Sequence, residues 1–146
     1  ADMFCPSRSV TRGEMAAFLV RALDLVLQPE EDLFTDDDNS VFEAEIETIR
    51  LHGITVGCTP TTFCPEQSVK RGEMAAFLVR AFGFSAANSS AGDSFADDDG
   101  TVFEADIETI RAVDVTSGCG QTSFCPQAEV TRGEMAAFLV RALAAT

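Results

Sequence analysis

The sequence predicts a mainly α protein made of tandem helix-loop-helix repeats. One block occurs three times, as VTRGEMAAFLVRAL from Val10, VKRGEMAAFLVRAF from Val69 and VTRGEMAAFLVRAL from Val130. The copies begin about 60 residues apart, and a fixed period of this size is typical of architectures whose units pack on their neighbours. A Phe-Cys-Pro triplet precedes each copy, starting at Phe4, Phe63 and Phe124. The repeat therefore indicates a function that depends on the surface built by the repeats and not on a single active site.

The first predicted helix of each unit follows an acidic run. Its apolar residues recur at helical spacing, at Phe42, Ile46 and Ile49 and again at Phe103, Ile107 and Ile110. Capping-box spacing predicts that these helices begin beside Ser40-x-x-Glu43 and Thr101-x-x-Glu104. We expect them to end at Gly53 and at Asp114, because both residue types tolerate a left-handed backbone.

The repeated block predicts the second helix. Thr11-x-x-Glu14 and Thr131-x-x-Glu134 are capping boxes, and Lys70 takes the Thr position in the middle copy, so that cap is lost or supplied differently. Met15, Phe18 and Leu19 lie on one apolar stripe, which assigns the methionines to the core.

The predicted division is one half unit, two complete units and a linker. The half unit covers residues 1–27, the complete units cover 33–84 and 95–146, and a small, polar linker covers 85–94. Because the chain starts inside a unit, we expect it to be a segment or a processed product of a longer protein. Cys5 then has its partner upstream or in another subunit.

The net charge of −14 excludes two classes of partner. Nucleic acids and anionic membrane surfaces both require an excess of Lys and Arg. The apolar runs are also too short for a membrane span.

The cysteines indicate an oxidising, extracellular compartment. Cys58 and Cys64 enclose a short loop, as do Cys119 and Cys125, and we expect two disulfides; free thiols or a zinc site are the alternatives. Asn88-Ser89-Ser90 in the linker is an acceptor pattern for N-glycosylation, with a plain linker as the alternative.

The acidic runs predict a calcium site in each complete unit. The candidate ligands alternate along the chain as Asp36, Asp38 and Ser40, and as Asp97, Asp99 and Thr101. Val41 and Val102 stand where an EF-hand needs Gly, so neither run is an EF-hand. The alternative is an acidic helix start that is solvated or paired with Arg.

The order of five motifs along the chain resembles that of the S-layer homology (SLH) family. They are Phe34-Thr-Asp36, a helix, Gly53-Ile-Thr-Val-Gly57, a Phe-x-Pro and the Thr-Arg-x-Glu block. The Cys-bearing form is similar to one found in surface proteins of actinobacteria. The resemblance implies a pseudo-threefold helical bundle whose grooves bind an anionic cell-wall polysaccharide.

The family resemblance also assigns the polysaccharide-binding role to Arg12, Arg71 and Arg132. The alternative is a structural ion pair with an acidic run of an adjacent unit. Phe42 and Phe103 take the place of the family's usual Trp, and the chain has no Trp or Tyr.

No catalytic constellation is evident, because the single His52 has Val113 as its counterpart in the next copy. We therefore expect no enzyme activity in this segment. The leading function is an extracellular, cell-surface or S-layer module that anchors to wall polysaccharide. The alternatives are a subunit of a head-to-tail filament and a segment of an enzyme whose catalytic domain lies elsewhere.

Overall fold

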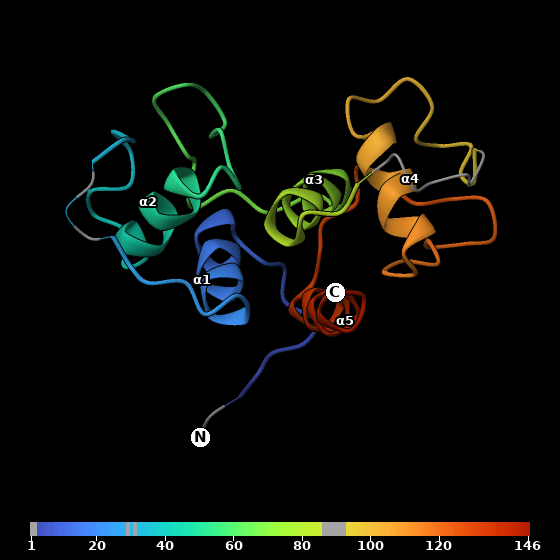
Figure 1. Cartoon of the computed structure of the whole chain (residues 1–146), viewed down its shortest axis with the longest axis horizontal. Helices are drawn as coiled ribbons and strands as arrows, with labels where there is room; N and C mark the ends of the chain where they lie inside the picture. The colour runs from blue at the N-terminus through green and yellow to red at the C-terminus, as the bar shows by residue number, and fades with distance from the viewer. Residues whose placement is uncertain (1–2, 29, 31, 86–92) are drawn as a thin grey trace. The chain divides into compact units, whose positions relative to one another are not determined.

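The computed structural model describes residues 3–28, 30, 32–85 and 93–146, and within them the fold is mainly α (Figure 1). The five helices there are α1 (Arg12–Ala22), α2 (Glu43–Leu51), α3 (Arg71–Phe82), α4 (Glu104–Ala112) and α5 (Arg132–Ala144). The described residues contain isolated β-bridges but no strand. None of the helices found there has the length and apolar character that a membrane span requires. The predicted mainly α class is confirmed.

The chain separates into two compact parts. One is Val10–Val69, and the other combines the N-terminal residues up to Ser9 with Lys70–Thr146. In the first part α1 packs against α2, and in the second α3 packs against α4 and touches α5. Each of α1 and α3 thus packs on the amphipathic helix that follows it across the acidic loop.

The start of each block helix follows the predicted capping chemistry. In α1, the Thr11 hydroxyl accepts a hydrogen bond from the Glu14 N–H (3.2 Å), and the Thr11 N–H donates to Glu14 Oε1 (3.1 Å). Thr131 and Glu134 repeat both bonds in α5. In α3 the Lys70 N–H still donates to Glu73 Oε1 (3.1 Å), so half of the cap is retained.

The predicted starts of α2 and α4 are wrong, because the N-caps are Phe42 and Phe103 and not Ser40 and Thr101. Both helices begin after a Phe N-cap, and no side chain caps them. The Ser40 hydroxyl accepts from the N–H of Phe42, and Glu104 Oε2 accepts from the N–H of Gly100. The Ser40 and Glu104 side chains therefore stabilise the turn before the helix. The predicted ends are confirmed, since Gly53 (φ 71°) and Asp114 (φ 62°) are left-handed.

The core of each part is built around a pair of phenylalanines. The ring centroids of Phe34 and Phe63 are 5.6 Å apart, and those of Phe95 and Phe124 are also 5.6 Å apart. All four side chains are fully buried, as are Met15, Met74 and Met135, which confirms the methionines as core residues. Gly57 (φ 89°) lies so close to Phe34 that a Cβ would come within 2.7 Å of the ring. The backbone approach there requires glycine.

Candidate functional site: the arginine contacts and the Arg71 pocket

The Arg that begins each block helix makes the same contact with a Phe-Cys-Pro segment. Arg12 Nε donates to the Phe63 carbonyl (2.8 Å), and its guanidinium carbon lies 4.7 Å from the centre of the Phe63 ring. The N–H of Gly13 donates to the Pro65 carbonyl (2.9 Å). We call this arrangement an Arg–Phe contact. It joins a helix start to the loop that precedes the next block in the sequence.

Two further Arg–Phe contacts lie in the second compact part. Arg71 Nε donates to the Phe124 carbonyl (2.7 Å), and Arg132 Nε donates to the Phe4 carbonyl (2.7 Å). The guanidinium carbons lie 4.6 and 5.0 Å from the respective ring centres. All three predicted arginines therefore occupy equivalent positions, each held by a hydrogen bond and a cation–π contact.

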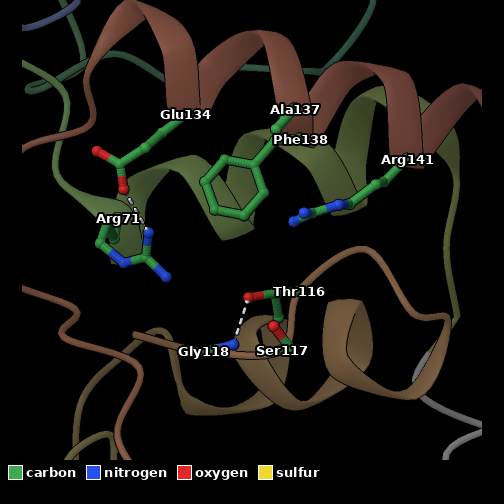
Figure 2. A pocket seen from close by; sticks show the side chains of 8 residues that line it. All are labelled: Arg71, Thr116, Ser117, Gly118, Glu134, Ala137, Phe138 and Arg141. Atoms are coloured by element: carbon green, nitrogen blue, oxygen red, sulfur yellow. Dashed lines mark hydrogen bonds and ion pairs between the residues drawn. The ribbon is translucent and has the colours of Figure 1, made fainter. Parts of the chain in front are cut away.

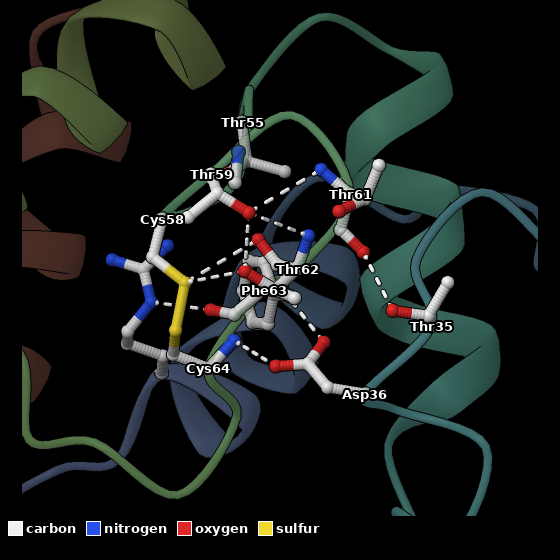
Figure 3. The surroundings of a disulfide bond; sticks show 11 residues. Thr35, Asp36, Thr55, Cys58, Thr59, Thr61, Thr62, Phe63 and Cys64 are labelled. Carbon is white, nitrogen blue, oxygen red and sulfur yellow. Dashed lines mark hydrogen bonds between the residues drawn. A yellow bond between two sulfur atoms is a disulfide. The ribbon is translucent and has the colours of Figure 1, made fainter.

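A disulfide and an aspartate shape two of the three Phe-Cys-Pro segments. Cys58 is bonded to Cys64 and Cys119 to Cys125, as predicted, while Cys5 is an exposed free thiol. Asp36 accepts hydrogen bonds from the N–H groups of Phe63 and Cys64, both at 2.8 Å (Figure 3). Asp97 makes the same pair of bonds to Phe124 and Cys125. The aspartate therefore holds the loop that carries the Phe carbonyl.

A pocket of about 220 Å³ opens beside Arg71 (Figure 2). It is lined by Arg71, Thr116, Ser117, Gly118, Glu134, Ala137, Phe138 and Arg141. These residues come from the start of α3, the turn after α4 and one face of α5. Because α3 and α5 are different copies of the block, the sequence of a single unit could not show that Arg71 and Arg141 share a pocket.

Arg71 is buried in the pocket wall, with 6% of its surface exposed. Its Nη1 forms an ion pair with Glu134 Oε2 (2.9 Å), and its guanidinium carbon lies 5.3 Å from the centre of the Phe138 ring. Burial lowers the pKa of Arg71, and the Glu134 carboxylate opposes this change. The guanidinium nevertheless stays charged at neutral pH, because the ordinary arginine pKa is far above it.

The pocket combines groups suited to an acidic sugar. Arg141 reaches it from the exposed side of α5 and makes no ion pair with the described residues. Ser117 adds an exposed hydroxyl, and the Thr116 hydroxyl is already engaged by the N–H of Gly118 (3.0 Å). Guanidinium groups bind carboxylates through charge-assisted hydrogen bonds. Glu134 opposes an anion in part, but it also fixes the orientation of Arg71.

Phe42 and Phe103, which stand where the sequence resemblance leads us to expect Trp, have a packing role. A Cβ on Gly13 would come within 2.9 Å of the Phe42 ring, and one on Gly72 within 2.7 Å of the Phe103 ring. Neither ring lines the Arg71 pocket.

The predicted calcium ligands do not gather as the sequence suggested. Asp36 and Asp97 lie beside the disulfides, where they bind backbone N–H groups. Asp38 instead groups with Asp32 and Asp37, and Asp99 groups with Asp93, Asp98 and Glu104. The Ser40 hydroxyl accepts a hydrogen bond from the Phe42 N–H, and the buried Thr101 hydroxyl has no hydrogen-bond partner among the described residues. These acidic clusters could bind an ion such as calcium.

Sequence reasoning missed Asp37 and Asp98, which are fully buried. The sequence signal for these two residues was that both copies have an aspartate at this position. It was passed over because the acidic run as a whole looked solvated. His52 is exposed at the end of α2, as expected. Asn88 lies outside the described residues, so the predicted glycosylation site stays a prediction.

No protein-family model matches the chain. The chain is similar to an endoglucanase of Bacillus sp. strain KSM-635, with 35% identity over 82 residues. The match covers 56% of this chain but only 9% of the endoglucanase. The similarity is therefore to a small region of a much longer protein.

Proposed function

We propose that this protein is an extracellular module of the SLH type that attaches to an anionic cell-wall polysaccharide. The observation that carries the proposal is the Arg71 pocket, in which Arg71 and Arg141 face one cavity with Ser117 and Phe138. Two disulfides agree with an oxidising, extracellular location. The module has an attachment role and no catalytic role of its own.

The order of the Arg–Phe contacts supports the family resemblance. Each block contacts the Phe-Cys-Pro before the next block, and the third block contacts the first Phe-Cys-Pro. A repeat that uses the same contact three times is a scaffold for equivalent ligand sites. Arg12 and Arg132 are the corresponding candidates for polysaccharide binding.

Co-sedimentation with purified cell walls of the source organism tests the proposal. The wild-type protein is expected to pellet with intact walls and to stay in solution with walls stripped of their polysaccharide. Arg141→Ala is expected to weaken binding at least about tenfold, since a charge-assisted hydrogen bond contributes about 1.5–3 kcal/mol.

The matched control for this test is Arg111→Ala. It removes the same charge from the surface of α4, where Arg111 pairs with Asp114 at 3.7 Å. Its binding is expected to equal that of the wild type. Equal binding by Arg141→Ala, or pelleting with stripped walls, would contradict the proposal.

A second candidate is attachment of a polysaccharide-acting enzyme to its substrate or to the cell. It is favoured by the similarity to part of a Bacillus endoglucanase. In this case the polysaccharide is cellulose-like and uncharged, and Arg141→Ala binds it as well as the wild type. Pelleting with cellulose in place of walls distinguishes the two candidates.

A filament subunit is the third candidate, favoured by the exposed thiol of Cys5. A second chain would then supply a cysteine, and disulfide-linked species would form under oxidising conditions. Non-reducing electrophoresis of wild type and Cys5→Ser tests this alternative.

A further inference from the structure

In each acidic loop an aspartate is buried beside a glutamate of the following helix, and of these four residues only Glu108 is partly exposed. Asp37 and Glu47 are both 0% exposed, and Asp98 is 0% exposed beside Glu108. Among the described residues, no hydrogen-bond partner reaches either carboxylate oxygen of Asp37 or Asp98, nor Glu47 Oε2 or Glu108 Oε2. Buried carboxylate oxygens are normally satisfied, so these six atoms require an explanation.

Each pair lies against further acidic side chains. Asp37 has carboxylate oxygens of Asp32 and Asp38 within 4.8 Å, and in the second copy Asp98 has those of Asp93, Asp99 and Glu104. Apart from Glu104, the members occupy corresponding positions of the two units, so the arrangement is built twice. The neighbouring charges that raise the pKa of Asp37 and of Asp98 all belong to carboxylates.

The electrostatics of these clusters disfavour the ionised state without a cation. Burial, together with the charge of Glu47, raises the pKa of Asp37 to about 7. Burial and the charge of Glu108 raise the pKa of Asp98 to about 6. Several carboxylates at this separation repel one another unless a proton or a cation lies among them.

One oxygen of each glutamate is held in place by the backbone. Glu47 Oε1 accepts hydrogen bonds from the N–H groups of Leu33 (2.9 Å) and Phe34 (3.0 Å). Glu108 Oε1 accepts from Ser94 (2.9 Å) and Phe95 (3.2 Å). These bonds fix each carboxylate and leave its second oxygen buried, which is how supporting contacts orient a metal ligand.

We propose that each acidic loop holds one Ca²⁺, bound by Asp37, Glu47, Asp32 and Asp38 in the first copy. The second site uses Asp98, Glu108, Asp93, Asp99 and Glu104. All the ligand atoms are oxygens, whereas zinc prefers nitrogen and sulfur ligands, so these clusters do not fit zinc. Calcium accepts six to eight oxygen ligands in flexible geometry, whereas magnesium demands a regular octahedron and keeps its water. The ion would tie the acidic loop to α2 in the first copy and to α4 in the second.

Calorimetric titration of the chelator-treated protein with CaCl₂ tests this proposal, and it needs no polysaccharide. We expect two Ca²⁺ per chain, bound at about 10⁻⁴–10⁻³ M as is usual for extracellular modules. The thermal unfolding midpoint is expected to be higher in millimolar Ca²⁺ than in EDTA, with a smaller rise in Mg²⁺. Absence of both calcium effects, or an equal rise in Mg²⁺, would overturn the assignment.

The diagnostic variant is the double substitution Asp37→Asn with Asp98→Asn. It keeps side-chain shape and removes one ligand charge from each site, so calcium affinity is expected to fall at least about tenfold. The control is Asp24→Asn with Asp114→Asn, which makes the same charge change at exposed residues outside both clusters. Unchanged calcium affinity in the diagnostic variant would refute these ligands, whatever the result of the wall-binding test.

Discussion

Two Arg–Phe contacts in the same compact part differ in how deeply they are buried. Arg71 and Arg132 each donate to a Phe carbonyl over 2.7 Å, and each following Gly N–H donates to a Pro carbonyl over 2.9 Å. Yet Phe124 is 0% exposed, whereas Phe4 is 47% exposed. The contact geometry is therefore independent of the depth of burial.

The difference lies in what surrounds the Phe-Cys-Pro segment. Phe124 has the Asp97 carboxylate and a disulfide beside it. Among the described residues, no carboxylate bonds the Phe4 N–H, and Cys5 is unbonded. Cys5 and Cys125 nevertheless share a left-handed backbone, with φ of 57° and 59°. The left-handed turn at the cysteine therefore forms without a disulfide. The aspartate and the disulfide-closed loop accompany the deeper burial of the Phe124 ring.

The largest expected effect comes from Asp97→Ala, which removes the hydrogen-bond acceptor of two N–H groups. Hydrogen bonds to a charged acceptor contribute about 1.5–3 kcal/mol, and we expect a total loss of about 2 to 3 kcal/mol because Asp97 is solvent-exposed. Urea unfolding measures the loss. Ser7→Ala, in the segment around Phe4, is the control and should leave stability unchanged.

Loss of the Cys119–Cys125 disulfide is expected to lower the free energy of unfolding slightly less than Asp97→Ala does. Cys119→Ser with Cys125→Ser opens a loop with a sequence separation of 6, for which chain entropy predicts about 2 kcal/mol. Because the turn does not depend on the disulfide, the helices should persist by circular dichroism. Loss of α3 or α5 at low temperature would show that the disulfide determines the fold.

A third prediction compares the glycines that follow Arg71 and Arg132. A Cβ on Gly72 would lie 2.7 Å from the Phe103 ring, whereas on Gly133 its nearest neighbour is the Pro6 carbonyl at 3.2 Å. We expect Gly72→Ala to destabilise by about 1 kcal/mol, because overpacking exceeds the gain in helix propensity. Gly133→Ala should be close to neutral. Equal effects on the unfolding free energy would contradict the comparison.

The last prediction is a dependence of the free energy of unfolding on pH in EDTA. The folded-state pKa values of Asp37 (about 7) and Asp98 (about 6) exceed the ordinary value of 3.8. Their contribution to stability is therefore fully present below pH 3.8 and is lost as pH rises through 6 to 7. In the Asp37→Asn with Asp98→Asn variant, the free energy of unfolding should depend less on pH than in the wild type. An unchanged pH dependence would contradict the raised pKa values of Asp37 and Asp98.

The sequence predicted features that depend on local chemistry. The block helices, their caps and the left-handed ends at Gly53 and Asp114 follow from short motifs, and the disulfides follow from cysteine spacing. Ser40 was misassigned as a cap because its spacing to Glu43 fits, while its hydroxyl bonds the Phe42 N–H instead.

Features that depend on tertiary contacts were beyond the sequence. Asp36 and Asp37 are adjacent, yet one binds the N–H groups of a loop and the other is buried against Glu47. Only the folded chain separates these roles. The approach of Arg141 to Arg71 likewise depends on how α5 packs on α3.

Binding of the isolated wall polysaccharide, with its acidic groups intact or chemically neutralised, tests the central claim most directly. Calorimetry with wild type and Arg141→Ala should show binding only of the acidic form, weakened at least about tenfold in the variant. Equal binding of both forms, or equal affinity of both proteins for the acidic form, would contradict the assignment of the Arg71 pocket to an anionic polysaccharide.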